Sequence, residues 1–295
     1  MTKGVLLAFL TYALYSSSDA LVKSLGGRMP VVEIVFFATL ANFIVILCLR
    51  PPGERWRDMF RPNHPKYVAI RAGCALIAGF GTALAYTTVP LAEAYALIFL
   101  APLLVTLLSV PILGEPVGWR RMAAVGVGLV GILLVVKPGF RDLHVGHLAA
   151  FIVAFAAAAS MIVMRLIGRT ERRVSLLGIV MVSCIVVSGI LMIPVFVWPG
   201  WSVLLPIAAI GVVGGVGQVT ILAATRHAPA NRVAPAQYSQ IVWAVFFGAV
   251  FFHEFPDTLS LAGIALIGLS GLFTFLREDK VSGWSRRIIL MRNQP

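Results

Sequence analysis

Uncharged polar side chains lie deep inside several long apolar runs of this 295-residue chain. An amide or hydroxyl that faced hydrocarbon would lack a hydrogen-bond partner, so such groups either bridge neighbouring helices or line a cavity. A bound molecule with charged or polar ends needs donors and acceptors of this kind. The candidates for binding it are Thr82, Gln218, Gln237 and Gln240.

Aromatic side chains accompany these polar groups in the same runs. They would supply an apolar wall for the side chain of a bound molecule, and their alternative role is contact with lipid. The aromatic candidates are Tyr86, Tyr95, Phe99, Tyr238 and Trp243.

Helical spacing predicts that some of these residues share a face. Gln237, Gln240 and Ala244 follow an i, i+3, i+7 pattern, and Trp243 lies within about 40° of that face. The sequence therefore predicts one polar and aromatic surface in the middle of this run.

Asp19 is the deepest carboxylate, about six residues from the centre of the first run and so roughly 9 Å from its midpoint at 1.5 Å per residue. Lys23 follows at the i, i+4 spacing that lets two side chains meet. Two interpretations are open: a structural ion pair or water-facing carboxylate near the helix end, or a residue for gating or proton coupling. No charge is expected at the membrane midplane itself.

Ten apolar segments hold these residues. The chain is 59% hydrophobic and 12% charged, which is more apolar surface than one soluble core buries. A helix needs about 20 residues to cross roughly 30 Å of hydrocarbon. The predicted segments are residues 4–22, 31–49, 67–88, 91–112, 122–137, 147–168, 176–198, 203–225, 233–252 and 258–276.

The second half of the chain repeats the first. Pro90, Glu115, Gly128 and Gly131 recur as Pro229, Glu254, Gly268 and Gly271, at offsets of 139, 139, 140 and 140. Two copies of a five-helix unit must lie in opposite orientations in one membrane, which is the inverted-repeat plan of many transporters. The predicted divisions are 1–138 for the first repeat, 139–276 for the second, and a basic cytoplasmic tail at 277–295. Both glutamates are expected to cap helix starts at opposite membrane surfaces, far from a shared site.

The basic residues indicate the orientation. Of the 24 lysines and arginines, only Lys23, Arg28, Lys137 and Arg141 fall on the side opposite the N-terminus. The positive-inside rule then places both termini in the cytoplasm. The net charge of +12 is thereby explained without a nucleic-acid partner.

Enzymatic chemistry has little support in the sequence. The three cysteines are isolated within apolar segments, and the five histidines lie in loops or at helix ends. No metalloprotease or phosphate-loop motif is present in the sequence. We therefore expect no metal, no cofactor and no catalytic residue.

Each half ends in a hydrophobic run, a glutamate turn and a glycine-spaced helix. The turns read Gly114-Glu115-Pro116 and His253-Glu254-Phe255-Pro256. In these features the chain resembles the paired EamA repeats of the drug/metabolite transporter (DMT) superfamily, and it is most similar to the YddG-type exporters of aromatic and other neutral amino acids.

The resemblance implies a central cavity lined mainly by helices 1, 3, 4, 6, 8 and 9. Exporters of hydrophobic cations in this superfamily hold an embedded carboxylate, and sugar-phosphate exchangers hold Lys or Arg, so an uncharged cavity favours a neutral or zwitterionic substrate. The sequence thus predicts a monomeric, all-α, ten-helix transporter of the inner (plasma) membrane that exports neutral amino acids or related metabolites by alternating access. The alternatives are export of other neutral metabolites or drugs, and a membrane protein without transport activity.

Overall fold

The computed structural model describes residues 2–48, 56–114, 118–137, 144–168, 170–228 and 233–273, and every regular element in these ranges is a helix. The predicted tail at 277–295 and Glu115 lie outside the described residues. The helices are α1 (Thr2–Ser24), α2 (Val31–Cys48), α3 (Pro65–Thr88), α4 (Leu91–Ile98), α5 (Ala101–Leu113), α6 (Trp119–Val136), α7 (Val145–Ile167), α8 (Arg173–Met192), α9 (Trp201–His227), α11 (Ser239–Phe252) and a last helix, Thr258–Phe273.

Three short 3-10 segments, η1 (Trp56–Phe60), η2 (Ile193–Val195) and η3 (Ala234–Tyr238), complete the described elements. Seven helical spans in the described ranges are long and apolar enough to cross a membrane. Three shorter apolar helices, Val31–Val45, Met122–Val136 and Thr258–Phe273, occupy the other predicted segments. The protein is therefore a helical multi-pass membrane protein.

Two of the predicted segments are not continuous α-helices. The run 91–112 divides into α4 and α5 at Phe99 and Leu100, and Pro102 is the second residue of α5. The run 233–252 begins as the 3-10 segment η3, which contains Pro235, and becomes α-helical only at Ser239. Proline lacks a backbone N–H and crowds the preceding turn, so both irregularities follow from its position near the start of a helical run.

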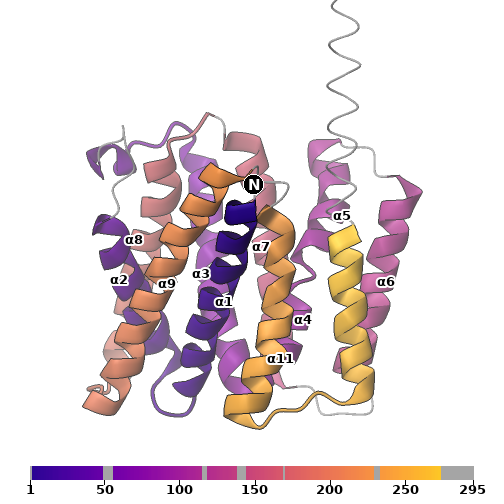
Figure 1. Ribbon diagram of the computed structural model, residues 1–295. Helices are drawn as coiled ribbons and strands as arrows, with labels where there is room; N and C mark the ends of the chain where they lie inside the picture. Colours follow the sequence, from indigo (N-terminus) through magenta and orange to yellow (C-terminus); the bar gives the residue numbers. More distant parts are fainter. Residues whose placement is uncertain are drawn as a thin grey trace, which may run out of the picture.

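Helix α1 lies at the centre of the bundle. It contacts α9, α11 and α3, and Figure 1 shows it between α9 and α11 with its N-terminal end at the top of the view. A large cluster of buried apolar side chains surrounds α4 and α5, where Leu91, Tyr95, Leu97 and Leu103 are each at most 2% exposed. Tyr86 and Tyr95 belong to this cluster, and their hydroxyls reach Asp19 of α1 at its border.

Helix α6 and the last helix, Thr258–Phe273, lie side by side at one edge of the bundle (Figure 1). Glycines permit their close approach, because a Cβ on Gly131 would lie 2.8 Å from the carbonyl oxygen of Gly263, and one on Gly263 would lie 2.5 Å from that of Gly131. The backbone cannot yield there without moving a helix. Gly131 was singled out by the sequence repeat, and close packing is its role.

Substitution of Gly131 by valine is expected to destabilise the protein by about 1–3 kcal/mol, because the new side chain overpacks a helix contact. The matched control is Gly126→Val in the same helix, where a Cβ would meet nothing within 4 Å. Thermal unfolding of the purified proteins in detergent measures both. Equal melting temperatures for the two variants would contradict the assigned packing.

Candidate functional site

A polar cavity of about 320 Å³ lies between α1, α2, α8, α9 and α11. Its lining residues are Tyr15, Ser18, Asp19, Asn42, Met181, Gly214, Gln218 and Gln240. This volume lies at the lower end of the range of small-molecule sites, about 300–1,000 Å³. We call it the amide cavity, because amide side chains from three helices face it.

A second cavity of about 310 Å³ lies between α1, α2 and α3. Its lining residues are Asp19, Val22, Ile34, Val35, Ala38, Thr39, Ala78, Gly79, Thr82, Ala83 and Tyr86. We call it the apolar cavity. Asp19 lines both cavities, so its carboxylate stands where they adjoin.

The expectation of an uncharged site was wrong at Asp19. The Tyr95 hydroxyl donates a hydrogen bond to Asp19 Oδ2, and the Tyr86 hydroxyl lies 3.4 Å from the same oxygen. The Tyr95 hydroxyl also lies 3.4 Å from the Ser16 oxygen. Asp19 is therefore held by tyrosine hydroxyls. An ion pair with Lys23, four residues along α1, was one of the interpretations left open, but Lys23 contacts Glu254 and two backbone carbonyl oxygens instead.

Four aromatic rings form a continuous row beside Asp19. Tyr86 and Tyr95 stack with ring centroids 5.4 Å apart and planes 10° apart. Phe99 follows at 5.8 Å from Tyr95, and Tyr238 at 5.6 Å from Phe99. Four of the five aromatic candidates thus come together, from α3, α4, the break after α4, and η3. The structure places them in protein contacts, not against lipid.

The fifth aromatic candidate, Trp243, does not join this row. Its ring packs against Phe247, one turn along α11, and against Phe246, each with centroids 5.9 Å apart. Trp243 lines neither the amide nor the apolar cavity. The predicted offset of about 40° was too small, because three residues along an ideal helix put Trp243 about 60° around from Gln240, and the ring turns toward its own helix neighbours.

Two of the three predicted glutamines reach the amide cavity. Gln218 lines it and accepts a hydrogen bond of 2.8 Å from the Tyr15 hydroxyl, and Gln240 lines it while only 9% exposed. Gln237 is exposed and lies in η3, where the helix is 3-10 and not α. The predicted shared face therefore fails for Gln237, because the i, i+3 rule assumed an uninterrupted α-helix.

Some residues of the amide cavity were missed by the sequence analysis. Asn42 is an amide within an apolar segment, and the reasoning that selected Gln218 applied to it equally. Tyr15 and Met181 carried no such signal. The family resemblance implied a cavity formed mainly by helices 1, 3, 4, 6, 8 and 9 of the ten predicted segments, whereas α2 and α8, which are the second and seventh segments, supply Asn42 and Met181.

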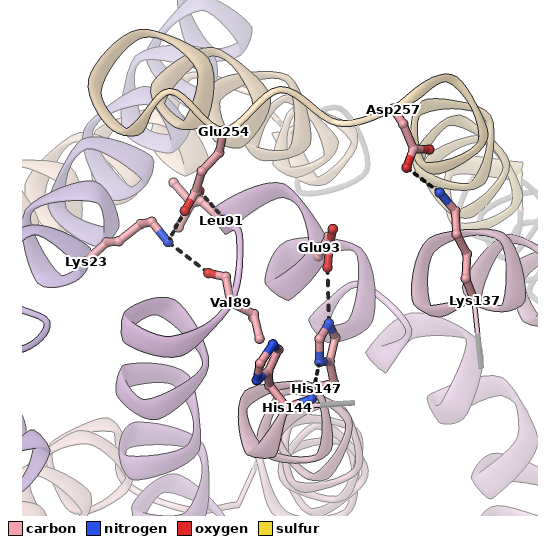
Figure 2. Close-up of polar contacts among 9 residues, drawn as sticks. All are labelled: Lys23, Val89, Leu91, Glu93, Lys137, His144, His147, Glu254 and Asp257. Carbon is pink, nitrogen blue, oxygen red and sulfur yellow. Dashed lines mark hydrogen bonds and ion pairs between the residues drawn. The ribbon is translucent and has the colours of Figure 1, made fainter. Parts of the chain in front are cut away.

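The end of the bundle opposite the N-terminus is tied by ion pairs and hydrogen bonds (Figure 2). Lys23 Nζ lies 2.8 Å from Glu254 Oε1, and it donates to the carbonyl oxygens of Val89 at 2.8 Å and Tyr86 at 3.2 Å. Glu254 Oε2 accepts the backbone N–H of Leu91 at 3.1 Å. Glu254 was expected to cap its own following helix, but it caps the first turn of α4 and joins α1 to the segment after α11.

A histidine–glutamate hydrogen bond and a second ion pair lie on the same end of the bundle in Figure 2. His147 Nε2 lies 3.1 Å from Glu93 Oε2, and Lys137 pairs with Asp257. Lys137 and the Ser260 backbone N–H hold the pKa of the partly exposed Asp257 carboxyl down at about 2. The Lys137–Asp257 pair joins the ends of α6 and the last helix, apart from either cavity.

Glutamates also fasten loops to helix ends elsewhere in the bundle. Glu33 Oε1 accepts the backbone N–H of Val197 at 2.7 Å and is fully buried. Glu171 accepts backbone N–H groups of Asn63 at 3.0 Å and His64 at 2.7 Å, just before α3. Burial acts to raise the pKa of Glu171, but these hydrogen bonds and that from Arg172 leave it lowered overall.

No group of three or more His, Cys, Asp or Glu side chains that could hold a metal ion occurs among the described residues. Membrane-spanning helices around a polar cavity, with ion pairs between segments at one end, are typical of membrane transport proteins.

The model of the EamA-like transporter family matches residues 2–137 and 144–276. The chain therefore belongs to the EamA-like transporter family. A solved crystal structure matches the fold with a TM-score of 0.62 at 21% identity, and the match covers 98% of this chain and 99% of that one. This likeness concerns the fold alone.

Two curated relatives cover nearly the whole chain. A pseudopaline exporter of Pseudomonas aeruginosa is 30% identical over 274 residues, which are 90% of this chain and 94% of the exporter. An S-adenosylmethionine uptake transporter of Rickettsia prowazekii is 26% identical over 281 residues, which are 94% of each chain. Membership of the superfamily predicted from the sequence is confirmed. Neither relative is named for aromatic amino acids, so the substrate remains a matter for proposal.

The structure yields a prediction about the Glu171 contacts. Glu171→Gln removes a charge that accepts backbone N–H groups, and this is expected to cost about 1–2 kcal/mol of stability at neutral pH. Because the pKa of Glu171 is lowered on folding from 4.5, its contribution is present above pH 4.5 and is lost as the pH falls through the folded-state pKa.

Melting temperatures of the wild type and Glu171→Gln, measured from pH 7 down to pH 4 and below, check this prediction. The difference between the two proteins should shrink on the acid side. A difference that is constant with pH would show that the carboxylate charge contributes nothing.

Proposed function

We propose that this protein is an inner-membrane transporter that moves small neutral or zwitterionic solutes, namely amino acids and related metabolites, by alternating access. The observation that carries the proposal is the amide cavity, which places hydrogen-bonding side chains from four helices, α1, α2, α9 and α11, around one small polar space. Its volume of about 320 Å³ suits a solute of amino-acid size.

The proposal includes two inverted repeats, residues 1–138 and 139–276, that form ten membrane crossings with both termini in the cytoplasm. The glutamate contacts support this symmetry. Glu33 and Glu171 stand 138 positions apart (171 − 33 = 138), and each accepts backbone N–H groups from a segment of the other half. Inverted copies would place these two contacts at opposite membrane surfaces.

Closure of one end of the site is the second element of the mechanism. The Lys23–Glu254 pair connects the two proposed repeats at the end opposite the N-terminus, which the positive-inside rule assigns to the outside. We propose that this contact holds the outer end shut and opens during each transport cycle. Export is the proposed direction, and the likeness to the pseudopaline exporter supports it, although the S-adenosylmethionine relative is an uptake transporter.

Transport by the purified protein in liposomes tests the function. A panel of labelled neutral amino acids, with aromatic members included, should contain at least one with saturable flux. If none crosses faster than in protein-free liposomes, the substrate assignment fails.

Gln218→Leu is expected to raise the KM for the transported amino acid roughly threefold to tenfold, because it removes a neutral hydrogen-bonding group from the amide cavity. The same exchange at Gln237, which is exposed and lines neither cavity, should change KM by no more than about twofold. Equal effects at both positions, with both proteins folded, would refute the assigned site.

Glu254→Gln is expected to loosen the outer end, because Lys23 loses its ionic partner. A single cysteine at Ser18, in a background without Cys48, Cys74 and Cys184, reports on access to the amide cavity. A membrane-impermeant maleimide added from the outer side should label this cysteine several-fold faster in Glu254→Gln.

The matched control is Asp257→Asn, which breaks the ion pair with Lys137 at the same end of the bundle but away from both cavities. Its labelling rate should equal that of the parent. Faster labelling in the control, or no change in Glu254→Gln, would contradict a gate at Lys23 and Glu254.

A further inference from the structure

The Asp19 carboxylate lacks a cationic partner among the described residues. Lys23 lies one helical turn away, but its ammonium group has three N–H donors and three contacts already. These contacts are with Glu254, Val89 and Tyr86. All three N–H donors of Lys23 are therefore used in contacts at the outer end, and Asp19 has no counter-charge from Lys23.

The hydrogen bonds to Asp19 also reach only one of its two carboxylate oxygens. The hydroxyls of Tyr95 and Tyr86 both approach Oδ2. Oδ1 receives no hydrogen bond from the residues that the structure describes, although it belongs to a side chain that lines both cavities. A carboxylate oxygen accepts readily, so Oδ1 is placed to receive a donor from a molecule in the cavities.

A carboxylate inside a membrane bundle is costly unless a cation or donors compensate it, and residues of this kind mark ion and substrate paths. We propose that Asp19 binds the ammonium group of the transported solute, so that the substrate class is zwitterions and amines that carry a protonated nitrogen. This inference rests on the proposed function and narrows it, since a neutral solute without an amino group would leave Asp19 uncompensated.

The surroundings of Asp19 fit an α-amino acid. Gln218 accepts the Tyr15 hydroxyl through Oε1, which leaves its amide N–H groups to donate. Asn42 uses one amide N–H on the Ala38 carbonyl oxygen, at 3.0 Å, and retains the other. Donors of the amide cavity can therefore bind the substrate carboxylate while its ammonium group binds Asp19.

The apolar cavity supplies the space for the substrate's side chain. It adjoins Asp19 from the other side, and aliphatic residues of α2 and α3 form most of its wall, together with Thr82. The stacked rings of Tyr86 and Tyr95 flank the carboxylate, and aromatic faces also attract ammonium groups. The ammonium group, the carboxylate and the side chain of an amino acid thus have separate binding places around Asp19.

Binding to the full-length protein in lipid nanodiscs, measured by isothermal titration calorimetry, tests the inference. The probes are L-phenylalanine and L-methionine, their counterparts without the amino group (3-phenylpropanoate and 4-(methylthio)butanoate), and phenethylamine. The wild type should bind at least one amino acid roughly 10- to 100-fold more tightly than its deaminated counterpart, since a charged hydrogen bond is lost with the amine.

Asp19→Asn should remove this preference, because the amide keeps the shape and accepts from Tyr95 but has no charge. Asp19→Glu retains the charge and should preserve the preference at least in part. Asp58→Asn, a surface carboxylate in η1 that pairs with Arg172, is the matched control and should behave as the wild type. The melting temperature of each variant shows whether it is folded.

The inference is overturned if deaminated probes bind as tightly as amino acids, if Asp19→Asn keeps the preference, or if none of the amine-bearing probes binds. Its failure is distinguishable from failure of the proposed function. Saturable flux of an amino-free solute that Asp19→Asn leaves unchanged would retain transport and reject the ammonium site. Asp19-dependent binding without flux in liposomes would retain the site and reject transport.

Discussion

Hydrocarbon offers no hydrogen bonds, and the arrangement of this bundle follows from that constraint. Every polar group within the spanning helices must find a partner in the protein or face a water-accessible space. Ser17 and Thr106 satisfy it locally, by donating to carbonyl oxygens one turn earlier in their own helices. The side chains of Asp19, Gln218 and Gln240 are too long or too polar to be satisfied by a carbonyl oxygen of their own helix. They lie instead around two adjoining cavities at the centre of the bundle.

The same constraint applies to the charged side chains at the helix ends. Lys23 spans from α1 to the C-terminal end of α3 and to Glu254, and Glu171 reaches the backbone just before α3. In each case a side chain from one segment satisfies backbone groups at the end of another, where helices leave N–H and C=O groups unpaired. The bundle is thus fastened at its two ends by contacts that a change in tilt between helices can break, while apolar packing around Tyr95 and Leu103 keeps its interior together.

The sequence predicted the helices well and the contacts between them poorly. Hydropathy and length located each segment, and the recurring glycines anticipated the close approach at Gly131. The i, i+3 rule failed at Gln237, because a proline-containing 3-10 segment interrupted the helix. Spacing along one helix allowed Lys23 to pair with Asp19, which was one of the interpretations left open, whereas tertiary structure brings Glu254 and two carbonyl oxygens to Lys23. Local spacing shows which side chains can meet, but it contains no information on competitors from distant segments.

We propose that the site opens and closes through relative movement of helices at the Lys23 and Glu254 end. A direct measurement is transport by a protein with cysteines at positions 23 and 254 in a background lacking Cys48, Cys74 and Cys184, before and after treatment with a short bifunctional thiosulfonate. Cross-linking should stop flux, leave the protein folded, and be reversed by a reducing agent. Undiminished flux through fully cross-linked protein would contradict alternating access at this end of the bundle.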